Sequence, residues 1–376
     1  MSQQKPYDKI ALVLQGGGAL GSYQAGVYNA LCEGNYMPDW ISGTSIGAIN
    51  GAIIASNTLS ESPKKLDYFW QKVARTDMFQ DFFAKGELRK WYNYTSGVTT
   101  LLSGNPSLFV PRPPYHLALQ SIAEKTSFYD PNPLRKLLQE IIDFDIINKI
   151  GDIRLTINAV NVTTGEGTIF DNRTTPILLD HIMACAALPP AFPAVRIGND
   201  LYWDGGVLSN TPLAAILSET PHQNILCFMI DLFNPHGKEP NSLSKVLMRQ
   251  KEISYASASD SHIAEFRIAH NLRRALHQVI AMLPEEERYN ITTEKFKELG
   301  ENTTMHIVHF TYRPHYYEWD SKDYDFSSLA INEHFMEGYL DAHWALKYST
   351  WLDEAPSDAG VIIHEIERGK KIVPLV

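Results

Sequence analysis

Two short apolar segments near the start of this chain each lead into a glycine-containing turn and then into a helical pattern, and this repetition constrains the fold most. Residues 9–14 precede three glycines at 16–18, and a helical pattern follows over 22–33. Residues 39–42 precede a second turn at 43–47, which opens an Ala- and Ile-rich helix. Alternating strand and helix are typical of a parallel α/β sheet, because a helix must return the chain before the next parallel strand begins. The sequence therefore predicts an α/β protein.

The remaining chain predicts a single α/β core with two additions. Residues 57–150 lack a clear strand and mix helical stretches with a loop rich in Gly, Pro and Ser. Further strands and helices are expected after this region: strands at 153–162, 167–170, 201–203, 224–232 and 305–312, and helices within 241–300 and at 334–346. We therefore expect a core over 1–230, with an insertion at about 57–150, and a mainly helical C-terminal extension over 231–376 packed on that core.

Composition excludes several classes of protein. The formal net charge is −10, which argues against a nucleic-acid partner, since such proteins usually carry a basic surface. The three cysteines form no CxxC pair and have no metal-ligand spacing, so neither a disulfide scaffold nor a metal site is indicated. No apolar run of about 18 residues suggests a transmembrane helix, and the apolar stretch at the N-terminus is too short for a secretory signal. We therefore expect a cytoplasmic protein.

The glycines at 16–18 begin a stretch, 16–21, that satisfies the G-x-G-x-x-G pattern and permits three interpretations. A dinucleotide site requires an acidic residue at the end of the second strand, but Asp39 lies at the beginning of that segment, before Trp40. An oxyanion hole is equally compatible, because consecutive glycines let backbone N–H groups converge on an oxygen with no Cβ in the way. A tight turn without a ligand is the third possibility.

Ser45 lies at the centre of a G-x-S-x-G motif between a predicted strand and a predicted helix. Gly43 and Gly47 permit a sharp elbow that would present the serine hydroxyl above the sheet. The positive end of the helix dipole would favour a developing alkoxide there. An ordinary serine in a glycine turn is the alternative, but a nucleophile directly after a possible oxyanion loop is what acyl transfer requires.

Asp204 ends a predicted strand and is followed by Gly205 and Gly206. We expect this arrangement to aim the carboxylate at the carboxyl edge of the sheet, where the active sites of α/β proteins lie. In a dry site the pKa of a carboxylate rises toward neutrality, and it can then act as a general base. In isolation an Asp-Gly-Gly sequence also fits a solvent-exposed turn.

Taken together, these blocks resemble the patatin-like phospholipase family of lipid acyl hydrolases. The resemblance implies a three-layer α/β/α fold and a Ser–Asp catalytic dyad that uses no histidine, cofactor or metal. It implies that Ser45 is the nucleophile and Asp204 the base. The oxyanion hole would be formed by Gly16, Gly17 and Gly18. The glycines that support the serine and aspartate motifs would be Gly43, Gly47, Gly205 and Gly206. The segment 184–193, together with Asn210 and Pro212, resembles further family blocks. Residues 322–341 and 111–113 suggest a bacterial subgroup with a helical C-terminal extension.

The sequence departs from this family pattern at two positions. The family often has Arg or Lys two residues after the third glycine, where this chain has Leu20. A cation beside the oxyanion or a phosphate headgroup is therefore missing from the loop. Cys185 occupies a position where the family commonly has serine, which removes a good hydroxyl donor.

Two further patterns carry expectations. The aromatic stretch over 78–110 suggests either core packing or a lid that opens at a lipid surface. Ile268, Leu272, Leu276 and Ile280 recur every four residues and predict one buried stripe on a helix. His306 and His309 would lie on opposite faces of a strand, so they make a poor metal pair.

The hypothesis favoured at this point is a serine lipid acyl hydrolase, similar to a phospholipase A, lysophospholipase or related esterase. The expected partner is a lipid or acyl-ester substrate, with the protein acting peripherally at a membrane or lipid-granule surface. Two alternatives remain open. One is a nucleotide-binding oxidoreductase that uses the glycine loop, and the other is a non-catalytic lipid-binding protein of the same fold.

Overall fold

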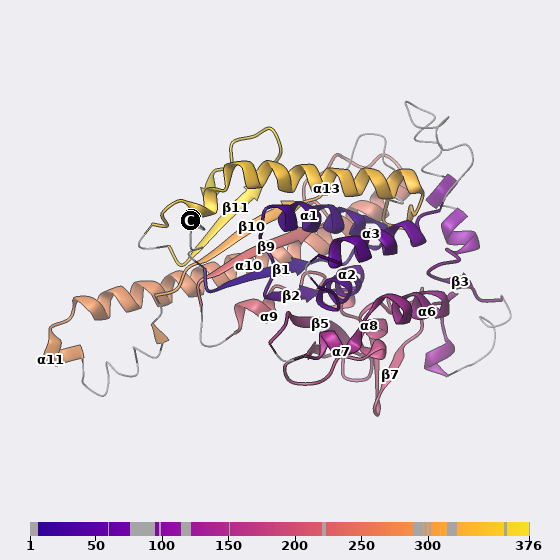
Figure 1. Ribbon diagram of the computed structural model, residues 1–376, viewed down its shortest axis with the longest axis horizontal. Coiled ribbons are helices and arrows are strands. Elements are labelled where there is room, and N and C mark those ends of the chain that lie inside the picture. Colours follow the sequence, from indigo (N-terminus) through magenta and orange to yellow (C-terminus); the bar gives the residue numbers. More distant parts are fainter. Residues whose placement is uncertain are drawn as a thin grey trace.

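The computed structural model describes most of the chain, and the statements below refer to that part. The described residues are 7–58, 60–75, 95–97, 99–113, 122–149, 151–219, 223–288, 296, 299–300, 302–313, 322–356 and 359–375, with backbone alone for 257–260 and 262. A mainly parallel sheet lies between two layers of helices (Figure 1). This confirms the predicted three-layer α/β/α architecture.

The central sheet has the strand order β12-β11-β10-β9-β1-β2-β5-β8-β7, with β6 pairing β5 from outside this path. The strands from β11 to β5 in this order run parallel, whereas β6, β7, β8 and β12 pair antiparallel. Their bounds are β1 Lys9–Leu14, β2 Trp40–Gly43, β5 Arg154–Asn161, β6 Gly167–Asp171, β7 Val195–Ile197, β8 Asp200–Asp204, β9 Ile225–Asp231, β10 Met305–Thr311, β11 Val361–Ile366 and β12 Pro374–Leu375. A separate two-stranded sheet joins β3 (Val110–Pro111) to β4 (Tyr129–Asp130).

The helices vary from single turns to one helix of 40 residues. The α-helices are α1 Gly21–Glu33, α2 Ile46–Ala55, α3 Ser62–Val73, α6 Asn132–Ile141, α7 Phe144–Ile147, α8 Leu179–Cys185, α9 Ala214–Leu217, α10 Leu243–Met282, α11 Glu285–Arg288 and α13 Ser328–Tyr348. The 3₁₀ turns are η1 Gly18–Leu20, η3 Ala123–Lys125, η4 Gly205–Val207, η5 Lys322–Tyr324 and η6 Thr350–Leu352.

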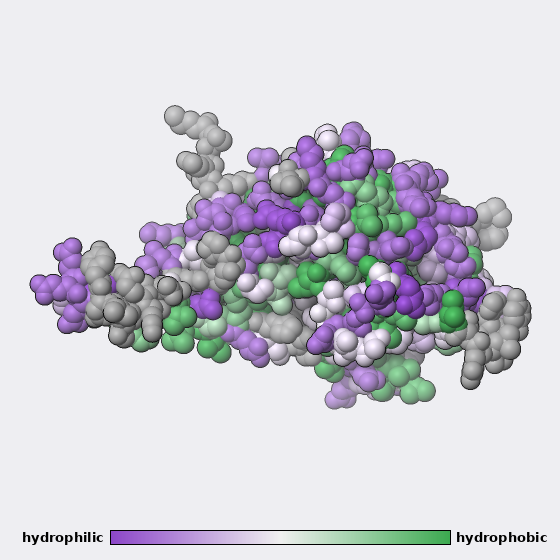
Figure 2. Space-filling model, turned by 90° about the horizontal axis from the view of Figure 1, so that it is seen from below, coloured by the Kyte–Doolittle hydropathy of each residue, from purple (hydrophilic) through white to green (hydrophobic). Residues whose placement is uncertain are grey.

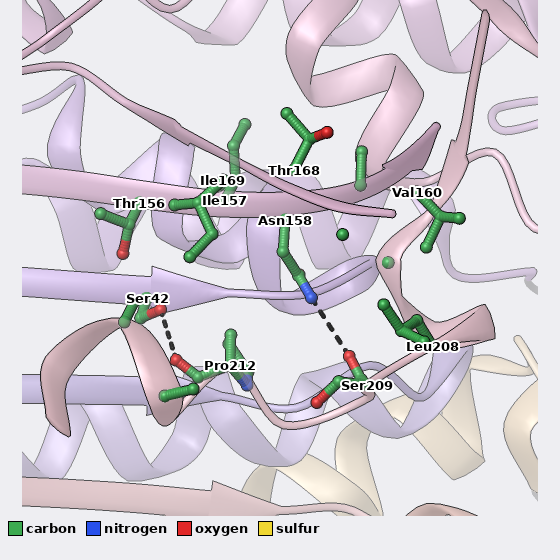
Figure 3. A pocket seen from close by; sticks show the side chains of 15 residues that line it. Ser42, Thr156, Ile157, Asn158, Val160, Thr168, Ile169, Leu208, Ser209 and Pro212 are labelled. Atoms are coloured by element: carbon green, nitrogen blue, oxygen red, sulfur yellow. Dashed lines mark hydrogen bonds between the residues drawn. The ribbon is translucent and has the colours of Figure 1, made fainter. Parts of the chain in front are cut away.

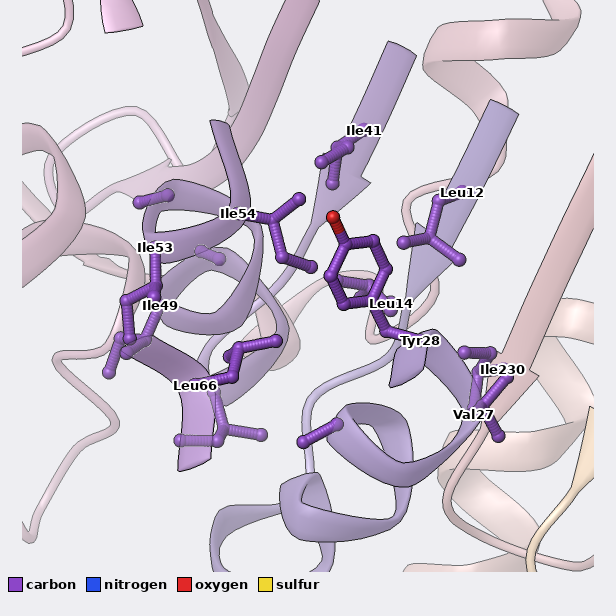
Figure 4. Close-up of a cluster of buried hydrophobic side chains, with 14 of the residues drawn as sticks. Leu12, Leu14, Val27, Tyr28, Ile41, Ile49, Ile53, Ile54, Leu66 and Ile230 are labelled. Atoms are coloured by element: carbon purple, nitrogen blue, oxygen red, sulfur yellow. The ribbon is translucent and has the colours of Figure 1, made fainter. Parts of the chain in front are cut away.

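The alternation of side chains along β1 creates two separate hydrophobic cores. Leu12 and Leu14 pack with buried residues of α1, α2, α3 and α13 on one face of the sheet, part of which Figure 4 shows. Ala11 and Val13 point to the other face, where α9 and α10 cover them. Because successive residues of a strand point to opposite faces, a central strand that is covered on both sides must be apolar throughout. The continuous apolar run of β1 has this cause.

The C-terminal helix α13 packs against α1 by backbone contact. A Cβ at Gly26 would overlap the carbonyl of Phe335, and a Cβ at Gly338 would overlap the carbonyl of Tyr23. The two helices can therefore approach this closely only because both crossing positions are glycine. The Tyr23 hydroxyl also donates a hydrogen bond of 2.8 Å to Asp341 of α13. This close crossing ties the C-terminal part of the chain to the first helix of the core.

The expected division of the chain at about residue 230 stays a prediction. Residues beyond that point contribute the two long helices α10 and α13 but also three strands, β10, β11 and β12. The first of these, β10, pairs in parallel with β9, so both parts of the chain share one sheet. Of the insertion expected at about 57–150, the described residues form α3, α6, α7 and the β3–β4 pair.

The stripe expected on the long helix is only partly buried. Ile280 is buried, but Ile268 and Leu272 are 69% and 70% exposed. Among the described residues of α10, Ala256, Ile263 and His270 are buried, and they recur every seven residues. The helix extends beyond the sheet in Figure 1, and Figure 2 shows apolar residues along the lower edge of that extension. Periodicity alone was misleading here, because a helix longer than the sheet it covers can repeat apolar residues on a face that meets no partner.

We predict different costs for two truncations on α10. Ile263→Ala should lower the free energy of unfolding by about 2–4 kcal/mol, because it leaves a cavity between the helix and the sheet. Leu272→Ala should change it by less than about 0.5 kcal/mol, since the side chain is exposed. Urea denaturation of both variants measures the difference. Equal losses would show that the outer face of α10 is covered in solution.

Candidate active site

The glycine loop after β1 comes close to two other parts of the candidate site. The N–H of Gly16 donates to the carbonyl of Asn210 at 3.2 Å, and Asn210 Nδ2 donates back to the carbonyl of Gly16 at 2.8 Å. A Cβ at Gly16 would lie 2.9 Å from the Cβ of Ser45 and would overlap the Asn210 side chain. Gly16 is therefore required for close approach, and its N–H is already used. The N–H groups of Gly17 and Gly18 are the remaining candidates for an oxyanion hole.

Gly18 has a positive φ of 56°, a backbone conformation that favours glycine. Any side chain there would also overlap the backbone carbonyl of Asp323 in η5. A Cβ at Gly17 would overlap the side chain of Leu232, which follows β9. The loop is thus held from outside by segments that lie more than 200 residues further along the chain.

Ser45 forms the elbow that the sequence predicted. Its φ of 55° and ψ of −123° put it in a strained region of the Ramachandran plot, between β2 and α2. Side chains at Gly43 or Gly47 would overlap backbone atoms of Gly47 and Leu14 respectively. The Ser45 N–H donates to the carbonyl of Cys185 at 3.1 Å. Ser45 is also the N-cap of α2, so it sits at the N-terminus of a ten-residue helix, where the helix dipole favours negative charge.

The register of the sheet sets the position of Asp204. Gly43 of β2 pairs with Ile157 of β5, and Ala159 of β5 pairs with Asp204 of β8. Since Ser45 follows Gly43 by two residues and Ala159 follows Ile157 by two, Asp204 lies level with Ser45. The sequence argument expected the end of this strand to lie at the carboxyl edge of the sheet, but β8 is antiparallel to β5. Its position therefore results from register and not from strand direction.

The Asp204 carboxyl is almost fully buried, with 1% of the residue exposed. Burial raises its pKa to about 7, while hydrogen bonding from Ser45 and from the Gly206 N–H and the charge of Lys251 lower it less strongly. Oδ1 accepts the Gly206 N–H at 2.8 Å. Oδ2 is buried and accepts no well-aligned hydrogen bond from the described residues. That oxygen is therefore available to receive a proton from a nearby hydroxyl.

Asn158 connects the serine elbow to the Asp204 turn, and sequence analysis missed it. Its Oδ1 accepts from Thr44 Oγ1 at 2.6 Å, and its Nδ2 donates to the carbonyl of Ser209 at 3.1 Å. A Cβ at Gly205 would overlap the Asn158 side chain, so this turn also requires glycine. Figure 3 shows Asn158 pointing from β5 toward Ser209. An asparagine inside an apolar strand was the only sequence signal for this contact.

An apolar hollow of about 160 Å³ lies beneath the 205–215 segment (Figure 3). Its lining includes Ile157, Val160, Ile169 and Leu208, but neither Ser45 nor Asp204. The hollow therefore borders the Asp204 turn from the side of β5 and does not contain the candidate reacting groups.

A buried polar network supports the base of the glycine loop. Gln15 Nε2 donates to Thr211 Oγ1 at 2.9 Å, and Thr211 in turn donates to Asp231 at 3.1 Å. His309 lies 3.1 Å from Asp231 and 2.8 Å from Glu365. Burial alone would lower the pKa of His309, but hydrogen bonds to these two carboxylates raise it to about 10. These contacts stabilise the end of the sheet beside the site.

Two histidines of β10 have separate partners, as their spacing predicts. His306 Nδ1 lies 3.0 Å from His364 Nε2, whereas His309 contacts Asp231 and Glu365. Within the described ranges, no group of three or more His, Cys, Asp or Glu side chains could hold a metal ion. No helix among the described residues is long and apolar enough to span a bilayer.

The position of Asp39 contradicts the dinucleotide interpretation of the glycine loop. Its Oδ2 accepts the N–H of Ile10 at 2.8 Å, at the beginning of β1. A ribose-binding acid would have to lie at the other end of β2, beside the glycine loop. Asp39 is therefore separated from that loop by the length of the strands.

Much of the predicted aromatic lid falls outside the described residues, including Met78, Phe79, Phe82, Phe83, Trp91, Tyr92 and Tyr94. At its far end Leu108 and Phe109 are buried, and Leu101, Leu102 and Val110 are exposed. A lid over residues 78–110 stays a prediction.

Comparison with known families agrees with the resemblance in the sequence. Residues 12–217, more than half of the chain, match the family described as patatin-like phospholipase. The chain belongs to the patatin-like phospholipase family. Residues 253–358 match a second family, described as patatin phospholipase. The family assignment thus extends from the core to α10, β10 and α13.

Several curated relatives share only part of this chain. Triacylglycerol lipase 5 of Saccharomyces cerevisiae is 45% identical over 201 residues, which cover 50% of this chain and 23% of that protein. A patatin-like phospholipase domain-containing protein of Chaetomium globosum is 46% identical over 55 residues, 15% of this chain and 6% of that protein. Patatin-like phospholipase domain-containing protein 7 of Rattus norvegicus is 56% identical over 46 residues, 12% of this chain and 3% of that protein. The matches therefore span less than a quarter of each relative.

Among solved structures, VipD from Legionella pneumophila is 14% identical, with a TM-score of 0.34 over 95% of this chain and 72% of that chain. The effector ExoU is 12% identical, with a TM-score of 0.25 over 78% of this chain and 62% of that chain. The fold assignment rests on the sheet and layers of this chain itself.

We predict that the charge of Asp204 destabilises the folded protein at alkaline pH. Folding raises its pKa to about 7. The free-energy cost of holding this charge in the folded protein is therefore absent below about pH 4, where the carboxyl is protonated in both the folded and the unfolded state, and it is complete above pH 7. Asp204→Asn removes that charge. The variant should therefore gain stability over the parent between pH 4 and pH 8, by on the order of 2–4 kcal/mol. Chemical denaturation of parent and variant at pH 4 and pH 8 measures the difference in their free energies of unfolding. A difference that is the same at both pH values would contradict the raised pKa.

Proposed function

We propose that this chain is a serine lipid acyl hydrolase of the phospholipase A, lysophospholipase or related esterase type. Ser45 and Asp204 form its catalytic dyad, and the N–H groups of Gly17 and Gly18 form the oxyanion hole beside Gly16. No histidine, metal or cofactor takes part. The observation that carries the proposal is the Asp204 carboxyl: it is buried level with Ser45, and its pKa of about 7 suits a general base.

The proposed reaction has two steps. Ser45 Oγ attacks the acyl carbonyl while its proton moves to Asp204, and the glycine N–H groups stabilise the resulting oxyanion. Collapse of this intermediate breaks the ester bond, and the departing alcohol takes the proton from Asp204. Water then attacks the acyl-enzyme with Asp204 again as the base, and a fatty acid and free Ser45 result.

A lipid substrate is supported by family membership and by the surface beside the site. The matching yeast relative is named as a triacylglycerol lipase. Val207 and Leu208, which closely follow Asp204, are 51% and 60% exposed. Apolar side chains exposed at the rim of a site are suited to contact with acyl chains. We therefore place the protein peripherally at a membrane or lipid-granule surface, and a cytoplasmic location stays a prediction.

Ser45→Ala should abolish ester hydrolysis and labelling by a fluorophosphonate probe. Removing the nucleophile of a serine hydrolase with a catalytic triad costs on the order of 10⁶ in kcat. Ser56→Ala is a control, since Ser56 is buried at the other end of α2 and its hydroxyl bonds only local groups: it donates to the carbonyl of Ile53 and accepts from Asn57 Nδ2. Mass spectrometry should locate the label on Ser45 in the parent and in Ser56→Ala. A folded parent that takes no label would favour the non-catalytic lipid-binding alternative.

Asp204→Asn should slow acylation of Ser45 by about 10²–10⁴, the usual range for loss of a general base. In the parent, kcat/KM for a short p-nitrophenyl ester should fall tenfold per pH unit below about pH 7, because only the ionised carboxylate accepts the proton. The variant should lack this acid limb. A variant with parental rate and parental pH profile would show that another group activates Ser45.

A further inference from the structure

The peptide between Gly16 and Gly17 is held from one side by Asn210, a residue of the segment that follows the Asp204 turn. The side-chain Nδ2 of Asn210 donates to the Gly16 carbonyl at 2.8 Å, and the backbone carbonyl of Asn210 accepts the Gly16 N–H at 3.2 Å. Asn210 is only 4% exposed, so these contacts are shielded from water. Two hydrogen bonds with one residue, 194 positions further along the chain, therefore fix Gly16.

This contact sets the direction of the Gly17 N–H. A peptide group is planar and trans, so its C=O and N–H bonds point in opposite directions. Because Asn210 binds the Gly16 carbonyl, the Gly17 N–H points away from the Asn210 amide. The next peptide is fixed locally, since the N–H of Leu20 in η1 donates to the Gly17 carbonyl at 3.2 Å. The Gly18 N–H therefore has a direction that does not depend on Asn210.

The N–H groups of Gly17 and Gly18 converge on one point. Gly17 has a φ of 176° and a ψ of 20°. At a φ near 180° the N–H bond of a residue eclipses its own Cα–C bond, and at a ψ near 0° the nitrogen of the next peptide lies on the same side. Both N–H bonds are then directed at the same position, where a single acceptor can bind both. Consecutive backbone N–H groups in such a turn form an anion-binding concavity.

The Asn210 amide also lies against the turn that carries Asp204. A Cβ at Gly206 would lie 2.9 Å from Asn210 Oδ1 and 3.2 Å from Asp204 Oδ1. A Cβ at Gly16 would overlap the same Asn210 oxygen and would lie 2.9 Å from the Cβ of Ser45. The amide is therefore placed between the proposed base and the proposed oxyanion donors. An effect of Asn210 on catalysis can run through either part, and the pH profile distinguishes the two routes.

We propose that Asn210 is a positioning residue of the oxyanion hole: its side-chain amide holds the Gly16 carbonyl and thereby aims the Gly17 N–H at the oxyanion. This inference rests on the proposed function, because it assumes that an oxyanion forms at Ser45 beside the glycine loop. The two donors of the hole differ in what fixes them. The Gly17 N–H depends on a distant side chain, whereas the Gly18 N–H depends on its own turn. Loss of the Asn210 amide should therefore weaken one donor and leave the other in place.

The test is the hydrolysis of a short p-nitrophenyl ester by the full-length variant Asn210→Ala at pH 8, above the acid limb expected from Asp204. The value of kcat should fall by about 10–10²-fold, less than the 10²–10³ that complete removal of an oxyanion donor costs. KM should stay within about twofold of the parent, because these donors bind the oxyanion more strongly than the ester carbonyl. An alkyl trifluoromethyl ketone, whose adduct with Ser45 carries the same oxyanion, should bind more weakly by about the factor lost in kcat.

Asn148→Ala is a matched control outside the candidate site. The Asn148 side chain also holds one residue by two hydrogen bonds: its Nδ2 donates to the Ile177 carbonyl at 2.9 Å, and its Oδ1 accepts the Ile177 N–H at 2.7 Å. This variant should lose stability and keep the parental kcat and ketone affinity. Parental kcat in folded Asn210→Ala, or equal losses of kcat in both variants, would overturn the proposal. A loss that disappears above a displaced acid limb would overturn it too, because Asn210 would then act through Asp204.

Asn210→Asp decides the question if Asn210→Ala does not fold. The substitution keeps the size and shape of the side chain, but an ionised carboxylate has no hydrogen to donate to the Gly16 carbonyl. On the plateau of the pH profile kcat should again fall by about tenfold or more, and a parental value would overturn the proposal. The proposed function fails separately, if the parent hydrolyses no ester or is not labelled by the fluorophosphonate at Ser45.

Discussion

The hydrogen-bonded register across β1, β2, β5 and β8 is the constraint on which the candidate site depends. It places the turn after β1 beside the turn after β2, because the two strands are parallel neighbours. It also brings Asp204 level with Ser45 across β5, although the two residues are 159 positions apart in the sequence. A slip of one residue in β8 would turn the carboxylate to the opposite face of the sheet. Short side-chain contacts, above all those of Asn158, then join the turns that the register has aligned.

Local patterns in the sequence predicted the parts of the site that lie on single turns. The glycine loop, the Ser45 elbow and the Asp204 turn each require glycines at fixed offsets, and such a requirement is visible in a few consecutive residues. The same logic predicted β1, β2, β5, β8, β9 and β10, which are apolar runs between turn signals. The three-residue β7 and the late β11 were missed, because short strands or strands that depend on long-range pairing leave little periodicity.

The sequence could not predict the side-chain contacts that join distant segments of the chain at the site. Asn158, Asn210 and Gln15 act through contacts more than 50 residues away, and nothing in their own neighbourhoods marks these partners. The same holds for Lys251 of α10, which pairs with Asp323 of η5 and lies over the rings of Phe233 and Tyr324. The exposed Ile268 and Leu272 show the converse, since their helical spacing is regular but no described segment covers them. The packing of distant segments therefore decides both which polar side chains make contacts at the site and which apolar side chains stay exposed.

The central claim is that folding converts Asp204 into a base that titrates near neutrality beside Ser45. The most direct measurement is an infrared titration of the protonated carboxyl stretch, taken as the difference between the parent and Asp204→Asn. It reports the carboxyl itself and does not depend on the substrate. The account predicts a carboxyl that is present in the parent, absent in the variant, and titrates with a pKa of about 7. A carboxyl that titrates near its ordinary pKa of about 4 would contradict it.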